Sequence, residues 1–357
     1  ESVWEKLHDE KVQLDYPELC RMFRAKENAV MSHMGGALDP SIKQPTEMVQ
    51  LVTDEKRLRN VGMSIARLKM SFKTLREDIV RVDDTALTED MLRMLIENAP
   101  TEAEVSLVQG YTGNVDLLSD VDRFFKELSN SPLLSQRLKY LNFRQGLRED
   151  LTELKLDFET FRMALSNLLK SSKLTQLLEM ILAVGNYMNG QSNRGGYWGF
   201  QVEFLPKLQD TKSVDNKSSL LDYILEYMEK TDTSNGTKLV TILDDFALLQ
   251  SLTSKEFHQL ESNFLKLKTT FEAAGRQRTV PKCVPEDRYG LVMGQFYDEN
   301  KEMVMSVAEL LNSVKELFSD VVRKFGCNRD ITMNDLVSIF ATFFRQLTEL
   351  RAELTKR

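Results

Sequence analysis

Apolar residues recur at helical spacing along most of this 357-residue chain. Between residues 54 and 70, for example, one face of a helix would carry Leu58, Val61, Ile65 and Leu68. Residues 47–130 have the pattern of several short helices, whereas residues 133–205 contain no proline, which suits longer ones. The pattern predicts an all-α protein, with further helical stripes in three segments: 131–184, 214–275 and 303–350.

Short polar motifs predict several helix boundaries. Thr88 is a candidate N-cap, and Thr101 stands three residues before Glu104, which is the spacing of a capping box. Thr332 and Asp335 have the same spacing near the C-terminal end. Glycine and proline predict further turns and helix ends at Asn235-Gly236, Gly275, the Pro281–Pro285 pair and Gly326.

A heptad pattern marks the C-terminal region. Its a and d positions alternate four and three apart at Met303, Val307, Leu310, Val314, Leu317 and Val321. After Gly326 a second series repeats the spacing at Leu336, Phe340, Phe343, Leu347 and Leu350. Because each series spans only two to three heptads, the pattern predicts packing in a helical bundle and not a long coiled coil.

The stretch from Leu177 to Ser213 is an unusual connection between helices. An apolar helix runs into the hexad Gly185-Asn186-Tyr187-Met188-Asn189-Gly190, and a glycine-bearing loop with Tyr197 and Trp198 follows. Helix connections in bundles usually span about two to eight residues. This one is longer, carries aromatic side chains among glycines and ends in a polar, charged tetrad. It therefore predicts a surface on which something docks.

The first 46 residues carry few apolar anchors. Trp4 is either a local packing residue or part of an arm that reaches into another subunit. Residues 28–46, with two glycines and two prolines, are either a flexible linker or an ordered surface loop. The chain opens without an initiator methionine inside a segment with a structured pattern, and we interpret it as a fragment of a longer protein.

Composition narrows the classes of function. Hydrophobic residues make up 42% and charged residues 28%, as in soluble globular proteins. The net charge of −7, with acids and bases interspersed, favours neither nucleic acid nor membrane as a partner. Three widely spaced cysteines (Cys20, Cys283 and Cys327) are typical of reduced thiols in an intracellular protein.

No catalytic motif is present. The sequence has no phosphate-binding G-x-x-x-x-G-K-[ST] loop and no H-E-x-x-H motif. Its three histidines, His8, His33 and His258, are too far apart in sequence to suggest a metal site or an acid–base relay. We therefore expect no enzyme activity, no metal and no cofactor.

Three motifs together resemble the formin homology-2 domain, the actin-assembling module of formins. They are the hexad at Gly185–Gly190, the aromatic–glycine turn at Gly196–Phe200 and the run Leu208–Ser213, in matching order and spacing. The resemblance implies an elongated multi-helix rod that forms a head-to-tail ring dimer. It also implies a division into a lasso (1–27), a linker (28–46), a knob (47–130), a coiled-coil bundle (131–173), a post (174–230), and a post return with the rest of the bundle (231–357).

The resemblance also implies dimerisation residues. In the family, the lasso tryptophan inserts into the post of the partner subunit, and Trp4 matches it. The post side of this contact would be formed by Gly185, Asn186, Tyr187, Met188, Asn189 and Trp198.

Actin contacts are implied at two places. Met63 occupies the knob position that meets the barbed-end cleft, where the family most often has isoleucine, and Arg57 and Arg59, beside the apolar stripe of the same helix, would add to the actin contact. Without the resemblance, a methionine in such a stripe would be predicted to lie in the core. Lys212 aligns with the family lysine that contacts actin from the lasso and post, although a lysine is more commonly just a solvated surface residue.

The implied function is an actin-binding module that nucleates filaments and stays processively on the barbed end, as a cytoplasmic homodimer. Profilin would join only through a proline-rich segment, and this chain holds none. Composition and periodicity alone fit an alternative equally well, a helical scaffold or tether without actin-assembly activity.

Overall fold

The computed structural model describes residues 48–356, except 191–195 and 234–235. Every regular element in these ranges is a helix, apart from three isolated β-bridges. The predicted all-α class is therefore confirmed. Trp4 and the predicted linker lie outside the described residues. Among the helices that are described, none is long and apolar enough to cross a membrane.

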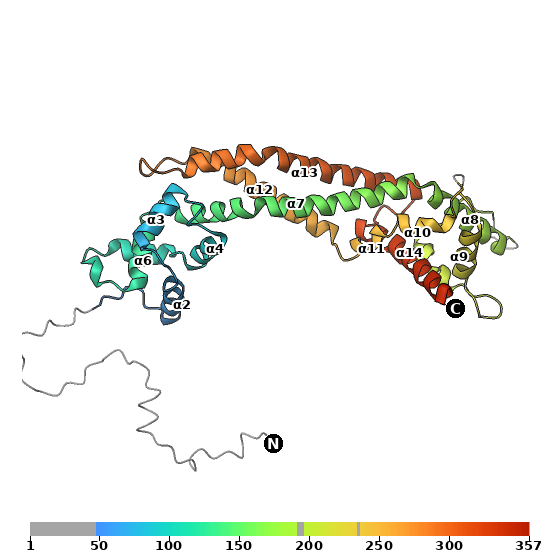
Figure 1. The fold of residues 1–357 in the computed structure, drawn as a ribbon, viewed down its shortest axis with the longest axis horizontal. Coiled ribbons are helices and arrows are strands. Elements are labelled where there is room, and N and C mark those ends of the chain that lie inside the picture. Colours follow the sequence, from blue (N-terminus) through green and yellow to red (C-terminus); the bar gives the residue numbers. More distant parts are fainter. Residues whose placement is uncertain (1–47, 191–195, 234–235, 357) are drawn as a thin grey trace, which may run out of the picture. The chain divides into compact units, whose positions relative to one another are not determined.

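Short helices form a cluster at the N-terminal side of the described chain (Figure 1). They are α2 (Glu55–Ile65), α3 (Phe72–Arg81), α4 (Glu89–Asn98), α5 (Glu102–Gly110) and α6 (Asp120–Ser129), with the 3₁₀ turn η3 (Val115–Leu117) before α6. Helices α2, α3 and α5 all pack against α6. Both predicted caps are confirmed, since Thr88 accepts the Met91 N–H and Thr101 forms a reciprocal capping box with Glu104.

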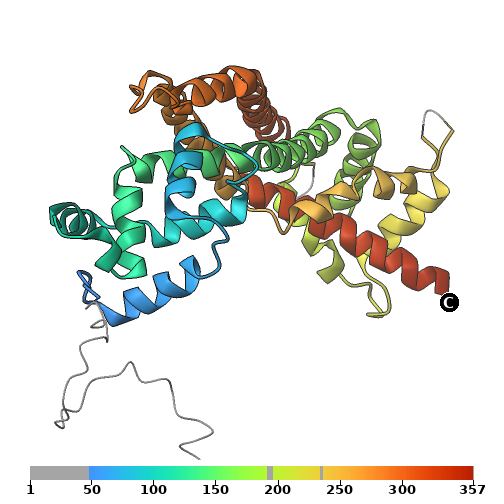
Figure 2. The same cartoon turned by 60° about the vertical axis from the view of Figure 1, so that its left-hand side comes forward.

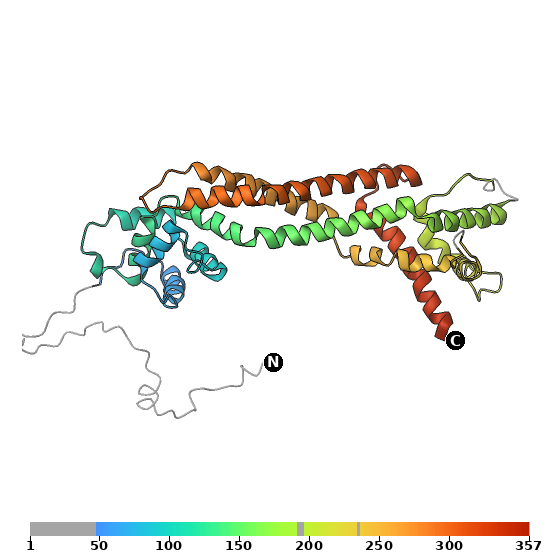
Figure 3. The ribbon, with the colours of Figure 1, turned by 45° about the horizontal axis from the view of Figure 1, so that its top comes forward.

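Three longer helices lie side by side: α7 (Leu134–Lys170), α12 (Phe257–Gly275) and α13 (Tyr289–Phe325) (Figures 1 and 3). α7 and α13 run in the same direction, and α12 runs opposite to both. The η6 turn (Arg276–Thr279) follows α12. Two hydrogen bonds agree with the parallel direction of α7 and α13. Arg148 donates to Asn300 at 3.0 Å, and Lys324 donates to the Leu169 carbonyl at 2.6 Å near the C-terminal ends of both helices.

The heptad seam predicted on α13 is only partly right. Val307, Val314 and Val321 are buried as predicted, but Met303, Leu310 and Leu317 are only half-buried, and Val304 and Leu311 are buried in addition. The reason is that α13 packs against both α7 and α12, so its buried stripe is broader than a two-helix seam. On α7, Leu156 lies in the segment 131–184, for which the pattern predicts a helical stripe, yet it is 67% exposed.

The remaining elements pack around the C-terminal helix α14 (Met333–Lys356), drawn in red in Figure 2. α14 contacts η4 (Val202–Asp210), α9 (Leu220–Lys230), α10 (Ile242–Asp245) and α11 (Leu248–Leu252), and η5 (Leu239–Thr241) contacts α9 and α10. Helix α8 (Ser172–Asn189) follows α7 and carries the hexad. The predicted cap of α14 is confirmed, since Thr332 and Asp335 bond each other reciprocally.

A buried ion pair joins the beginnings of α7 and α13. Arg137 is 0% exposed and donates through both terminal nitrogens to the Asp287 carboxylate, at 3.0 and 2.6 Å. Its Nε donates to the Pro132 carbonyl at 3.0 Å, and its guanidinium lies 4.5 Å from the Tyr289 ring centroid. Asp287 also accepts the N–H groups of Cys283 and Tyr289. Both charges are therefore fully partnered inside the protein.

These contacts control the ionisation of Asp287. Burial, the largest single effect, would raise the pKa of this carboxyl. The hydrogen bonds from Arg137, Cys283 and Tyr289 together outweigh it and hold the pKa well below its ordinary value. Asp287 consequently stays ionised in the folded protein under conditions in which an unfolded chain would protonate it.

We predict that Asp287→Asn lowers the free energy of unfolding by about 3–5 kcal/mol at pH 7, because it leaves the Arg137 charge buried without its carboxylate. Urea denaturation measures this. The matched control is Asp298→Asn, which breaks the exposed pair with Arg278 and should cost about 0–1 kcal/mol.

The same pair predicts a dependence on acid. Because the folded-state pKa of Asp287 is lowered, its contribution is complete above the unfolded pKa of about 3.9 and declines as pH falls below it. The stability difference between wild type and Asp287→Asn should therefore narrow steadily below about pH 4. A difference that stays constant from neutral pH down to pH 3 would contradict this assignment.

Candidate functional site

The hexad lies on the last turns of α8. Asn189, the last residue of α8, donates through Nδ2 to the Gly185 carbonyl at 2.8 Å. The Asn186 side chain binds the backbone of Tyr197, in the loop that follows residue 195. Its Nδ2 donates to the Tyr197 carbonyl and its Oδ1 accepts the Tyr197 N–H, each at 3.0 Å. One amide side chain thus fixes both polar groups of the Tyr197 backbone.

This arrangement exposes large apolar side chains on one part of the surface. Tyr187 is 89% exposed and Trp198 is 100% exposed, while Met188 and Tyr197 are each more than half exposed. We call these four residues the hexad surface. Soluble proteins scatter single apolar residues over their surface, but adjacent ones mark interaction sites. The sequence predicted a docking surface here, and these exposures support that prediction.

Gly185 adds to the same surface. A Cβ atom built on it would meet no other atom within 4 Å among the described residues. Packing inside the protomer therefore does not require a glycine at this position. Glycine inside a helix costs about 1 kcal/mol relative to alanine, so its presence suits the close approach of another molecule.

Met63 lies on α2 and is 55% exposed, so the alternative that places it in the core is wrong. Its helical neighbours Val61 and Ile65 are buried. Arg59 is exposed, as expected of a contact residue. Arg57 differs, because Glu104 binds its guanidinium at 3.1 Å and only 23% of its side chain is exposed.

Lys212 is exposed at the base of a short loop that precedes α9. Its backbone forms an antiparallel bridge with Ser219, flanked by a hydrogen bond from the Leu220 N–H to the Thr211 carbonyl at 2.7 Å. The backbone under Lys212 is thus fixed, and its ammonium group is in solvent. The structure does not bring Lys212 or Met63 into contact with the hexad surface within the protomer.

Asp222 shows the electrostatic effect of Lys212. Burial of the Asp222 carboxyl, the largest single effect, raises its pKa. Hydrogen bonds from Ser219 and the nearby Lys212 charge together outweigh burial and lower the pKa below its ordinary value. Asp222 therefore remains an ionised cap at the start of α9, where a negative charge is favourable.

Sequence reasoning missed several exposed or anchoring residues. Phe204 and Tyr223 are large apolar or aromatic residues that are more than half exposed. Asp122 is fully buried and accepts the N–H groups of Leu51 and Val52 at 3.0 and 3.2 Å. The Ser119–Asp122 spacing was the signal for a cap, but nothing in it indicated the contact with the incoming chain.

Metal chemistry has no support in the part of the chain that the structure describes. No group of three or more His, Cys, Asp or Glu side chains there has the geometry to hold a metal ion. The exposed apolar side chains are instead typical of protein–protein contact. Fold and surface thus define an all-α protein with exposed apolar side chains around the end of α8.

Comparison with known proteins identifies the family. The sequence profile of the Formin Homology 2 Domain matches residues 1–348, and the chain belongs to that family. The resemblance inferred from the three motifs is confirmed.

Several relatives align along nearly the whole chain. Disheveled-associated activator of morphogenesis 1-A of Xenopus laevis is 28% identical over 370 residues, which cover 99% of this chain and 34% of the relative. The human Disheveled-associated activator of morphogenesis 2 is 29% identical over 362 residues, covering 99% and 33%. Formin-J of Dictyostelium discoideum is 28% identical over 355 residues, covering 99% and 14%. The chain therefore spans about a third or less of the length of these relatives.

We predict that Asn186→Ala releases the loop beside the hexad surface, because both hydrogen bonds to the Tyr197 backbone disappear. Loss of about 1 kcal/mol of local stability corresponds to roughly fivefold faster exchange of the Tyr197 amide hydrogen. Amide hydrogen exchange measures it. Asn186→Asp is the control, since it keeps the acceptor and should give a smaller increase. Unchanged exchange in the alanine variant would show that other contacts hold the loop.

Proposed function

We propose that this chain is an actin-binding module that nucleates filaments and stays on the barbed end during elongation, acting as a homodimer in the cytoplasm. The observation that carries the proposal is the match to the Formin Homology 2 Domain along residues 1–348. The exposure of Met63, Lys212 and the hexad surface supports it, because all three are presented to solvent as an interface requires.

The dimer contact is proposed at the hexad surface. A second copy would place the indole of its Trp4 against the surface that Tyr187, Met188 and Trp198 leave exposed. Burial of one indole removes about 150–250 Å² from water. At about 25 cal/mol per Å² this amounts to about 4–6 kcal/mol as an upper bound. Two such contacts in a head-to-tail ring would both contribute to the stability of the dimer.

The actin contacts are proposed at Met63, with Arg59 beside it, and at Lys212. The Met63 thioether is flexible and suits an apolar cleft. Lys212 and Arg59 add positive charge, which aids encounter with an acidic surface and sets orientation more than it adds affinity. Arg57 no longer belongs with these contacts, because its guanidinium is bound within the protomer.

Processive association follows from having two halves. While one half of a ring releases the filament, the other half holds it, so rebinding occurs at a high effective concentration. A protomer alone would dissociate after each release. Dimerisation and filament residence are therefore proposed as one coupled property.

We predict that Met63→Ala and Lys212→Asp each abolish the acceleration of actin polymerisation, measured with pyrene-labelled actin, while the dimer persists in analytical ultracentrifugation. Both side chains are exposed, so the fold should be unaffected. Matched controls are Leu107→Ala and Lys217→Asp, which alter other exposed side chains of the same types. If wild-type dimers leave polymerisation unchanged, the chain acts instead as a helical scaffold.

We predict that Trp4→Ala and Trp198→Ala each shift the protein from dimer to monomer in sedimentation equilibrium. Trp198 is 100% exposed in the protomer, so its removal should change the free energy of unfolding by no more than about 0.5 kcal/mol. The control is Leu265→Ala, another exposed apolar residue, on α12. Dimers that survive both tryptophan substitutions would place the subunit contact elsewhere.

A further inference from the structure

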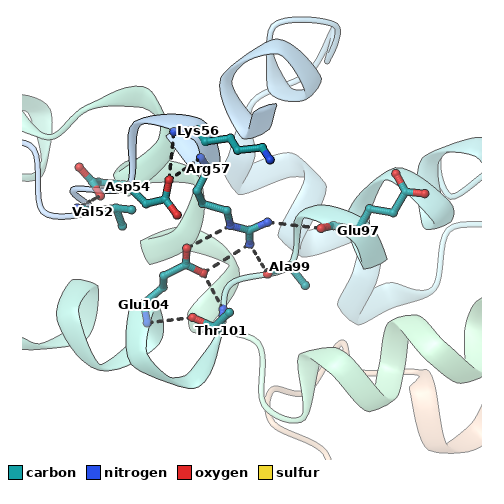
Figure 4. Close-up of polar contacts among 9 residues, drawn as sticks. Val52, Asp54, Lys56, Arg57, Glu97, Ala99, Thr101 and Glu104 are labelled. Carbon is teal, nitrogen blue, oxygen red and sulfur yellow. Dashed lines mark hydrogen bonds and ion pairs between the residues drawn. The ribbon is translucent and has the colours of Figure 1, made fainter. Parts of the chain in front are cut away.

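One guanidinium, that of Arg57 on α2, contacts α4 and α5 (Figure 4) and also approaches α6. Arg57, in the first turn of α2, donates from Nε to Glu104 Oε1 at 3.1 Å and from Nη2 to the Ala99 carbonyl at 2.8 Å. Glu104 belongs to α5, and Ala99 is the C-cap of α4. The Arg57 guanidinium also lies 5.5 Å from the ring centroid of Phe125 on α6, within the range of a cation–π contact.

The contacts with α4 fall on a helix end. The last carbonyls of a helix have no partner within it and carry partial negative charge. Arg57 donates to the Ala99 carbonyl and, at 3.4 Å, to that of Glu97. The arginine therefore caps α4 from a helix about 40 residues earlier in the chain.

The contact with α5 falls on its beginning. The Glu104 carboxylate that binds Arg57 also accepts the Thr101 N–H at 2.7 Å, as the second half of the capping box. Burial, the largest single effect, would raise the pKa of Glu104, but the bonds from Arg57 and Thr101 outweigh it and lower the pKa. The pair is therefore ionised at neutral pH, and Figure 4 shows both partners of Glu104 converging on it.

Helix α2 needs such an anchor. It has only 11 residues, too few for a stable helix in isolation. Its buried side chains are just Val61 and Ile65, and its packing partners are α6 and α4. Val61 and Ile65 lie in the second half of α2 and hold that part of the helix. The Arg57 contacts therefore attach the first turn of α2 to its neighbours.

Arg57 and Met63 point to different sides of α2. Six residues separate them, which corresponds to about 9 Å along the axis and roughly 240° around it. Arg57 faces the other helices of the cluster, whereas Met63 is 55% exposed. Any rotation or tilt of α2 would redirect Met63 relative to a bound partner.

We propose that Arg57 is a positioning residue for the actin contact: it fixes the orientation of α2 through α4 and α5, and thereby aims the Met63 side chain, without touching actin itself. This inference rests on the proposed function of the Met63 surface.

Glu104→Gln separates positioning from direct contact. Glutamine at this position still completes a capping box, so α5 keeps its N-terminus, but the charge that holds Arg57 is gone. If Arg57 contacts actin directly, freeing its guanidinium leaves barbed-end affinity equal or higher. If Arg57 positions α2, affinity falls, and we expect about a tenfold loss in seeded-elongation assays of the full chain. Glu89→Gln is the matched control, because it removes the carboxylate of an exposed pair with Arg93 on α4.

Arg57→Lys provides the second test. Lysine keeps the positive charge but cannot bridge Glu104 and the α4 carbonyls with one planar group. We expect affinity to fall as in Glu104→Gln, with no further fall when Arg57→Lys is added to Met63→Ala. Additive losses in that double-mutant cycle would overturn the proposal, because they would give Arg57 a contact of its own.

Amide hydrogen exchange distinguishes positioning from general unfolding. In both variants, exchange should accelerate within α2 and stay unchanged within α14, which packs against η4, α9, α10 and α11. Unaltered α2 exchange together with unaltered affinity in Glu104→Gln overturns this inference alone. Wild-type protein that fails to bind barbed ends overturns the proposed function, and this inference with it.

Discussion

A buried ion pair between Arg137 and Asp287 joins the long helices α7 and α13 where both begin. α7 and α13 run in the same direction although they are far apart in the chain, so no short loop sets their relative height. A slip of one helical turn, about 5.4 Å, would leave two buried charges without partners. Each such charge costs several kcal/mol when uncompensated. The pair therefore disfavours such a slip.

The pair of Arg57 and Glu104 follows the same logic at a less buried place. A bidentate, charged hydrogen-bonded pair fixes the orientation of its two partners, whereas apolar contact is not directional. In both pairs the carboxylate is also bonded to backbone N–H groups, of Thr101 in one and of Cys283 and Tyr289 in the other. Each carboxylate is thus bonded both to backbone groups within four residues of it and to an arginine from a distant part of the chain.

The difference between local and distant contacts explains which features of the fold could be predicted from the sequence and which could not. The caps at Thr88, Thr101 and Thr332 lie within four residues of their partners, so spacing alone was sufficient. The α13 seam was partly wrong, because its position depends on two neighbouring helices that the heptad pattern does not specify. The partner of Arg57 is 47 residues away and that of Arg137 is 150, and no periodicity reports such contacts. Met63 was assigned to the surface only through the family resemblance.

At the hexad surface, large side chains are exposed to solvent although hydrogen bonds hold the backbone that carries them. The indole of Trp198 is fully exposed, so burial within its own protomer does not stabilise it. The Asn186 side chain nevertheless bonds through both polar groups of its amide to the backbone of Tyr197, the residue before Trp198. Because this backbone is already fixed, binding removes less conformational entropy from it. Aromatic side chains have few rotatable bonds, so they lose little further conformational entropy on binding. At Gly185, no described neighbour occupies the space of the missing Cβ. Packing among the described residues therefore does not explain a glycine at this position in the helix.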